Sequence, residues 1–209
     1  MNDEFNRSGL RKLIDNQLGM RVSTNGYSYG NLFGNFFNFF LSGGECAEDV
    51  QKHFRPTLEQ IPGNAVASAD TLLRSFNELA TENTTVVSST QKEYQFNINE
   101  KLNDLNIKSL LLTKQLEKGK FYDLDFGWNH LPTSSMGANT VYLIITAMMK
   151  HFYNYLVQKV SNVFTDILPT SRLKRFIFRF IAVAGQYVYR GRQWILKLYT
   201  DRPYEKLLV

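Results

Sequence analysis

The chain has 209 residues, of which 44% are hydrophobic and 14% aromatic, with only five prolines and a net charge of +5. This composition predicts a folded protein with one sizeable core or two small ones, and it excludes a largely disordered chain. The single cysteine, Cys46, excludes an internal disulfide, and the absence of a signal peptide or a long apolar run indicates a cytoplasmic protein.

Four short helices are predicted in the first 82 residues, because apolar side chains recur there at three- and four-residue intervals. Their ranges are 8–19, 29–41, 47–54 and 68–80. Gly19 and Pro56 are expected to end the first and the third, and Ser68 or Asp70 to cap the fourth. The phenylalanines of 29–41 are predicted core residues, although Phe37 lies off the main apolar stripe, which leaves open that it marks a surface for a partner.

In the middle of the chain, the sequence pattern predicts a connector, a helix and a strand. Residues 81–90 are polar and are read as the connector, and 97–117 form an amphipathic pattern typical of a helix. Residues 121–126 read as a short buried strand that carries Asp123 and Asp125 at alternate positions. An acidic pair on an apolar strand costs desolvation energy unless it binds something, usually a metal ion.

In the last part of the chain, the sequence pattern predicts two helices and a hairpin. Residues 139–160 are apolar on most sides, which predicts a helix inside the domain, capped by Ser134 or Ser135. Residues 171–184 predict a basic helix, and 187–199 predict two short strands around a turn at Gly191.

Positive charge is concentrated at the C-terminal end. Residues 171–209 contain nine Lys or Arg and two acids, a charge of +7, whereas residues 1–170 sum to −2. Such asymmetry indicates a polyanion as partner, and the i, i+3, i+7 spacing of Arg172, Arg175 and Arg179 gives the basic helix a cationic face. The alternative is the solvated face of an ordinary surface helix. The candidate phosphate-binding residues are Arg172, Lys174, Arg175, Arg179, Arg190, Arg192, Lys197 and, on the helix 68–80, Arg74.

Two separated blocks of the sequence resemble bacterial insertion-sequence transposases of the Asp-Asp-Glu (DDE) superfamily, whose catalytic domain has an RNase H-like fold. The first block contains SGLRKLIDNQLG, SADTLLRSFNELA and the motif Tyr-Asp-Leu-Asp at 122–125. The second contains GWNHLPTSSMGANTVYLIITAMMKHFYNYL and RFIFRFIAVAGQYVYRGRQWILKLY. Together the blocks cover nearly the whole chain.

The resemblance implies a mainly α fold with a small β component, in which an N-terminal helical region precedes an incomplete RNase H-like (α/β) transposase catalytic fold. The helical region, a candidate DNA-binding region, covers 1–82. A helix and the first catalytic strand cover 83–126, and the C-terminal helices and basic hairpin cover 127–209. The central catalytic region of longer family members is missing between 126 and 127.

Catalysis in full-length relatives is implied to be DNA strand transfer by two Mg²⁺ ions held by three carboxylates. Only one of these carboxylates has a counterpart here, Asp125 or, with the alternate register, Asp123. The chain is therefore expected to be a catalytically inactive remnant whose acidic strand binds Mg²⁺ weakly or not at all.

The expected partners are DNA, as element ends or nonspecifically, and an intact transposase or another copy of the chain. No membrane span is expected. A rival hypothesis from another class is a non-catalytic interaction protein whose basic amphipathic C-terminal helix binds a protein partner or an anionic membrane surface.

Overall fold

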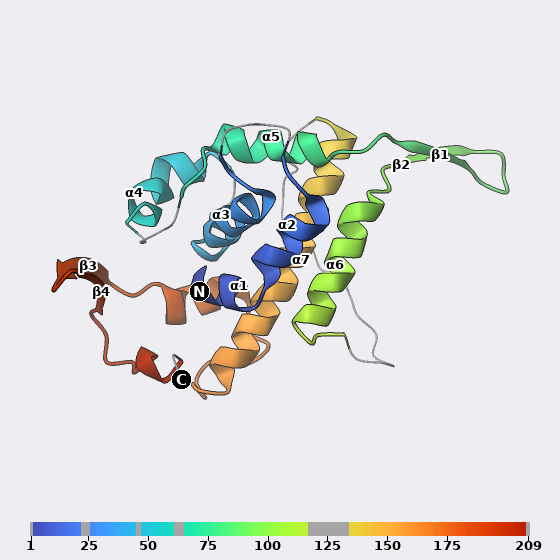
Figure 1. Ribbon diagram of the computed structural model, residues 1–209. Coiled ribbons are helices and arrows are strands. Elements are labelled where there is room, and N and C mark those ends of the chain that lie inside the picture. The colour runs from blue at the N-terminus through green and yellow to red at the C-terminus, as the bar shows by residue number, and fades with distance from the viewer. Residues whose placement is uncertain (1, 22–25, 45–46, 61–64, 117–133, 208–209) are drawn as a thin grey trace.

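The computed structural model describes residues 2–21, 26–44, 47–60, 65–116 and 134–207 (Figure 1). It is mainly helical with a small β component, as predicted. The helical elements are α1 (Asn2–Arg7), α2 (Leu10–Leu18), α3 (Tyr29–Leu41), η1 (Val50–Phe54), α4 (Arg55–Leu58), α5 (Ala69–Leu79), α6 (Glu100–Leu112), α7 (Met136–Ser161), α8 (Leu173–Phe176), η2 (Ile177–Ile181) and η3 (Tyr204–Leu207). The sheets are the antiparallel hairpins β1 (Thr84–Val87) with β2 (Glu93–Phe96), and β3 (Gly185–Arg190) with β4 (Gln193–Leu198).

The long helix α7 is the centre of the fold. Its N-terminus is capped by Ser135, whose Oγ accepts a hydrogen bond from the Ala138 N–H at 3.4 Å. Buried residues lie on most sides of it, as predicted, because α6 packs along it, α5 crosses it near its N-terminal end, and α2 packs on α6 (Figure 1). Despite the length of α7, no described helix combines the length and apolar character that a membrane crossing requires.

Helix α3 is buried along its whole length, because α1, α2, α5 and α7 all contact it. Ser28 caps it by accepting a hydrogen bond from the Asn31 N–H, and Asp15 of α2 accepts one from the Gly30 N–H at 2.7 Å. Phe37 is fully buried and packs against Phe152 of α7, with ring centroids 4.5 Å apart. The prediction that Phe37 is a core residue is therefore confirmed, and the alternative that it marks a surface is wrong.

Two N-terminal predictions need correction. Helix α1 was not predicted, yet Phe5 from it enters the core. The predicted stop at Pro56 is also wrong, because α4 continues to Leu58 with Pro56 in its first turn, where a missing N–H costs no helical hydrogen bond.

The predicted end at Gly19 and cap at Ser68 are confirmed, with Gly19 in a positive-φ conformation and Ser68 Oγ accepting from the Thr71 N–H. Cys46 lies outside the described residues.

The connector predicted at 81–90 is wrong, because residues of this tract form strand β1, which pairs with β2. β-branched residues fill β1, and their preference for extended backbone outweighs the polar composition. The following helix is shorter than predicted. It ends at Leu112, and Lys114 adopts a left-handed conformation that stops it.

The C-terminal hairpin is confirmed, but the basic helix predicted for 171–184 is shorter and changes type. It runs as α8 and then as the π-helical η2, whose wider turn is closed by a hydrogen bond from the Ala182 N–H to the Ile177 carbonyl.

One hydrophobic core extends from Phe5 to Phe180, so residues of the predicted regions 1–82 and 127–209 pack together.

Candidate nucleic-acid interface

The basic segment is anchored to the body by aromatic side chains. Phe176 and Phe180 are buried and stack on each other with centroids 5.0 Å apart, and Phe176 meets Tyr153 of α7 edge-on at 5.6 Å. The Tyr153 hydroxyl donates a hydrogen bond to the Ser171 carbonyl, and its burial raises the pKa of the phenol. The apolar side of α8 and η2 is therefore occupied by the core.

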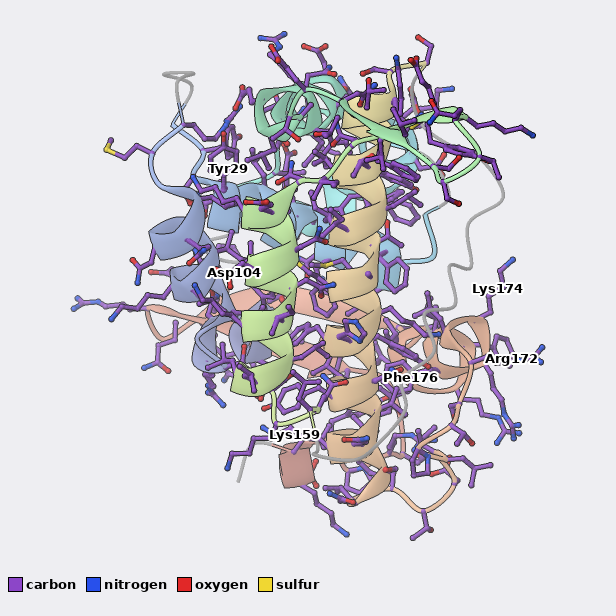
Figure 2. The ribbon with its side chains drawn as sticks, turned by 90° about the vertical axis from the view of Figure 1, so that its right-hand side faces the viewer. Tyr29, Asp104, Lys159, Arg172, Lys174 and Phe176 are labelled. Atoms are coloured by element: carbon purple, nitrogen blue, oxygen red, sulfur yellow. The ribbon has the colours of Figure 1, made fainter. Side chains whose placement is uncertain are left out.

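The cationic side of this segment faces solvent. Arg172, Lys174, Arg175 and Arg179 are all exposed, which agrees with the face predicted from their spacing. Figure 2 shows Arg172 and Lys174 pointing away from α7, whereas Phe176 lies on the side of the helix nearer α7. Within the described part of the chain, neither Arg172 nor Arg175 has an ion pair, so their charge is available to an anionic ligand.

An acidic side chain near this segment, Asp166, is already bound. Asp166 accepts hydrogen bonds from Arg202 on both oxygens, at 3.0 Å from Nη1 and 2.8 Å from Nη2. These hydrogen bonds lower the pKa of the Asp166 carboxyl, and the charge of Arg179 adds to the effect. The guanidinium group of Arg202 also lies over the ring of Phe164, with its Cζ atom 5.1 Å from the ring centroid. The arginine therefore has a structural role and was not among the predicted candidates.

The β3–β4 hairpin extends the exposed positive charge. Gly191 and Arg192 form its two-residue turn, both with positive φ as a type I′ turn requires. The register pairs Arg190 with Gln193 and Gln186 with Lys197, which puts Arg190 and Lys197 on the same face of the hairpin. All three predicted hairpin cations, Arg190, Arg192 and Lys197, are exposed.

Arg74 does not join this surface. It lies on α5, which packs on α3 and α7 at the opposite side of the body from the basic segment (Figure 1). It forms an i, i+4 ion pair with Asp70, which partly neutralises its charge. The structure therefore gives Arg74 no role in the same interface.

The predicted catalytic and metal positions, Asp125 and Asp123, lie outside the described residues, so their assignment stays a prediction. Within the described segments, no group of three His, Cys, Asp or Glu side chains converges as a metal site would require. Asp166 in particular has both oxygens bound by Arg202. The described acids thus offer no set of oxygen ligands that fits Mg²⁺.

Sequence reasoning missed the exposed aromatic residues of the hairpin. Tyr189 is 60% and Trp194 57% exposed, and their ring centroids are 5.2 Å apart across the two strands. The alternation of residue types over 187–198 was a usable signal, since it puts every second side chain on one face.

Comparison of the chain with models of protein families, with curated proteins and with solved structures gives no match in any of the three. The resemblance to DDE transposases therefore rests on the quoted sequence blocks alone.

Proposed function

We propose that the chain is an internally deleted, non-catalytic relative of insertion-sequence transposases that binds the DNA backbone through its basic C-terminal segment. The observation that carries the binding proposal is the exposure of Arg172 and Arg175 without ion pairs in the described structure, on a segment fixed to the core by Phe176 and Phe180. Arg179 and the hairpin cations continue this charge. Phosphate contacts of this kind position a protein on DNA without reading its sequence.

The transposase part of the proposal is supported by the sequence blocks, and it includes the RNase H-like ancestry of 83–209 and the loss of the central catalytic region. It implies that Mg²⁺-dependent cutting or joining of element-end DNA is absent. The rival membrane hypothesis needs a free apolar face on the basic helix, and Phe176 and Phe180 occupy that face within the protein.

The test is the salt dependence of duplex DNA binding, followed by fluorescence anisotropy of a labelled 20-base-pair duplex. The logarithm of the affinity should fall with the logarithm of the salt concentration by about 0.9 per phosphate neutralised. The triple variant Arg172→Gln, Arg175→Gln, Arg179→Gln should lower the slope by roughly 2 to 3.

A matched control removes the same charge elsewhere, by Lys12→Gln, Lys52→Gln and Lys92→Gln, all at exposed positions outside the basic segment. This control should keep the slope of the unmodified protein. A flat salt response, or equal losses in the two triple variants, would contradict the proposed binding surface.

A further inference from the structure

The β3–β4 hairpin projects from the helical body and exposes both of its faces (Figure 1). A backbone hydrogen bond from the Tyr199 N–H to the Ala184 carbonyl extends the pairing of the two strands at the base of the hairpin. A two-stranded hairpin alone is only marginally stable in water. An exposed hairpin rich in aromatic residues therefore indicates a surface that binds something.

The register separates two kinds of side chain at the end of the hairpin. Tyr189 and Trp194 are directly opposite each other and share one face, while Arg190, the next residue along, lies on the other face. Arg192 is in the turn between the strands. Two exposed rings are thus flanked by two arginines within a few residues.

The charge of the hairpin indicates which kind of ligand its turn end can bind. Residues 185–199 contain three basic residues and no Asp or Glu. A second copy docking hairpin to hairpin would bring like charges together, which is unfavourable. Single-stranded nucleic acid instead supplies phosphates for the cations and unpaired bases for the rings, and stacking on aromatic side chains tolerates any base sequence.

We propose that this tip, formed by Tyr189, Trp194, Arg190 and Arg192, binds single-stranded nucleic acid by base stacking. This inference rests on the proposed DNA binding and deepens it. The basic helical segment holds duplex phosphates, and the hairpin tip engages unpaired bases next to them. Duplex DNA keeps its bases stacked internally, so it offers the tip phosphates but no free base face.

The experiment uses the intrinsic fluorescence of Trp194. The chain has two tryptophans, so the variant Trp128→Phe leaves Trp194 as the only source of tryptophan emission. Titration with a 15-nucleotide oligothymidylate, and in parallel with oligouridylate, should quench this emission, while a duplex of equal length should leave it nearly unchanged. The two oligonucleotides distinguish DNA from RNA as the preferred strand.

Affinity is then measured for Trp194→Ala by anisotropy. The loss of one stacking ring should weaken single-strand binding about 5- to 150-fold, with duplex binding changed less than about twofold. Tyr94→Ala is the matched control, because Tyr94 is an exposed aromatic residue of the other hairpin, on β2. It should leave both affinities unchanged, and Trp194→Phe should retain most of the single-strand affinity.

Several results would overturn the inference. One is salt-dependent duplex binding through Arg172, Arg175 and Arg179 without any quenching by single strands, which leaves the proposed function intact. Emission that changes with protein concentration alone would assign the tip to a second copy, and a blue shift only with anionic vesicles would assign it to a membrane surface. Absence of binding to both duplex and single strands would instead contradict the proposed function itself.

Discussion

At the scale of single residues, the ion pair between Arg21 and Glu78 is the most buried of the described salt bridges, with side chains 2% and 17% exposed. Arg21 Nε and Nη2 donate to the two carboxylate oxygens at 2.9 and 2.7 Å, and Nη1 donates to the Tyr27 carbonyl. The hydrogen bonds to Glu78 raise the pKa of Arg21. The pair connects the residues after α2 to the end of α5.

Glu78→Ala is expected to lower the free energy of unfolding by about 3–5 kcal/mol, because Arg21 would stay buried without a counter-charge. Glu59→Ala is the matched control. It breaks the exposed i, i+4 pair with Arg55 and should cost only about 0–1 kcal/mol. Urea unfolding followed by circular dichroism measures both values, and similar losses in the two variants would contradict the assigned role of burial.

His151 predicts a pH dependence of stability. Its Nε2 atom is buried without a hydrogen-bond partner, and burial lowers the pKa of the imidazole, with the charge of Lys150 adding to the effect. Below the unfolded-state pKa of 6.5, the unfolded chain binds a proton that the folded chain does not. Stability should therefore fall as the pH drops from 7.5 to 5.5.

His151→Met should reduce this fall, because an unbranched apolar side chain fills the site without titrating. The measurement is the urea midpoint of both proteins at pH 7.5 and pH 5.5. Unchanged pH dependence in the variant would assign the effect to other groups.

At the scale of elements, the contact between α2 and α3 depends on Gly30. A Cβ atom added there would lie 2.8 Å from the Arg11 carbonyl oxygen and 2.8 Å from Asp15 Oδ2. Asp15 also accepts the hydrogen bond from the Gly30 N–H, so a displaced helix would lose part of its N-terminal capping.

Gly30→Ala is therefore expected to destabilise the protein by about 1–3 kcal/mol through overpacking. Gly34→Ala tests the same replacement on the same helix, where the added Cβ would meet the Phe5 ring at an ordinary 3.4 Å. It should be neutral or stabilising by up to about 1 kcal/mol, because alanine has the better helix propensity. Thermal unfolding of the two variants checks the difference, and a loss at Gly34 equal to that at Gly30 would contradict it.

The elements also show what sequence can predict. Helices α3 and α7 were predictable because apolar periodicity and Ser caps agree there. The β1–β2 hairpin was missed because its strands are only four residues long and its turn uses Gln91 with positive φ, where Gly or Asn is usual.

The candidate interface was predictable in part. Helical spacing predicted the exposure of Arg172, Arg175 and Arg179, since a basic face opposite an apolar one must point to solvent. The pair of Arg202 with Asp166 was not predictable, because 36 positions separate them and only tertiary packing brings them together. The shift to a π-helical turn at η2 likewise has no local signal in the sequence.

At the scale of the whole molecule, the N-terminal helix closes onto the end of α7. Glu4 Oε1 accepts hydrogen bonds from Lys159 at 2.6 Å and from the Tyr155 hydroxyl at 2.9 Å. Burial alone would raise the pKa of the Glu4 carboxyl, but these hydrogen bonds outweigh it and lower the pKa. Phe5 packs against Phe152 beside them. The first helix therefore belongs to the same folding unit as the long central one.

This arrangement predicts one cooperative unfolding transition, in contrast to three independent regions divided near residues 82 and 126. Phe36 contacts Phe76 and Tyr142 at one end of the core, and Phe180 packs among aromatic residues at the other. Phe36→Ala and Phe180→Ala should each lower the stability of the same transition by about 3–5 kcal/mol, because each leaves a cavity in one continuous core.

Phe178→Ala is the control, since Phe178 is 81% exposed and lies on η2 beside Phe180. It should change stability by less than about 0.5 kcal/mol. Calorimetry and far-ultraviolet circular dichroism should give one coincident transition for all three variants. Two transitions, with Phe36→Ala shifting only one and Phe180→Ala only the other, would show that the ends of the core fold separately, because a shared core transmits the loss of either ring to the whole unit.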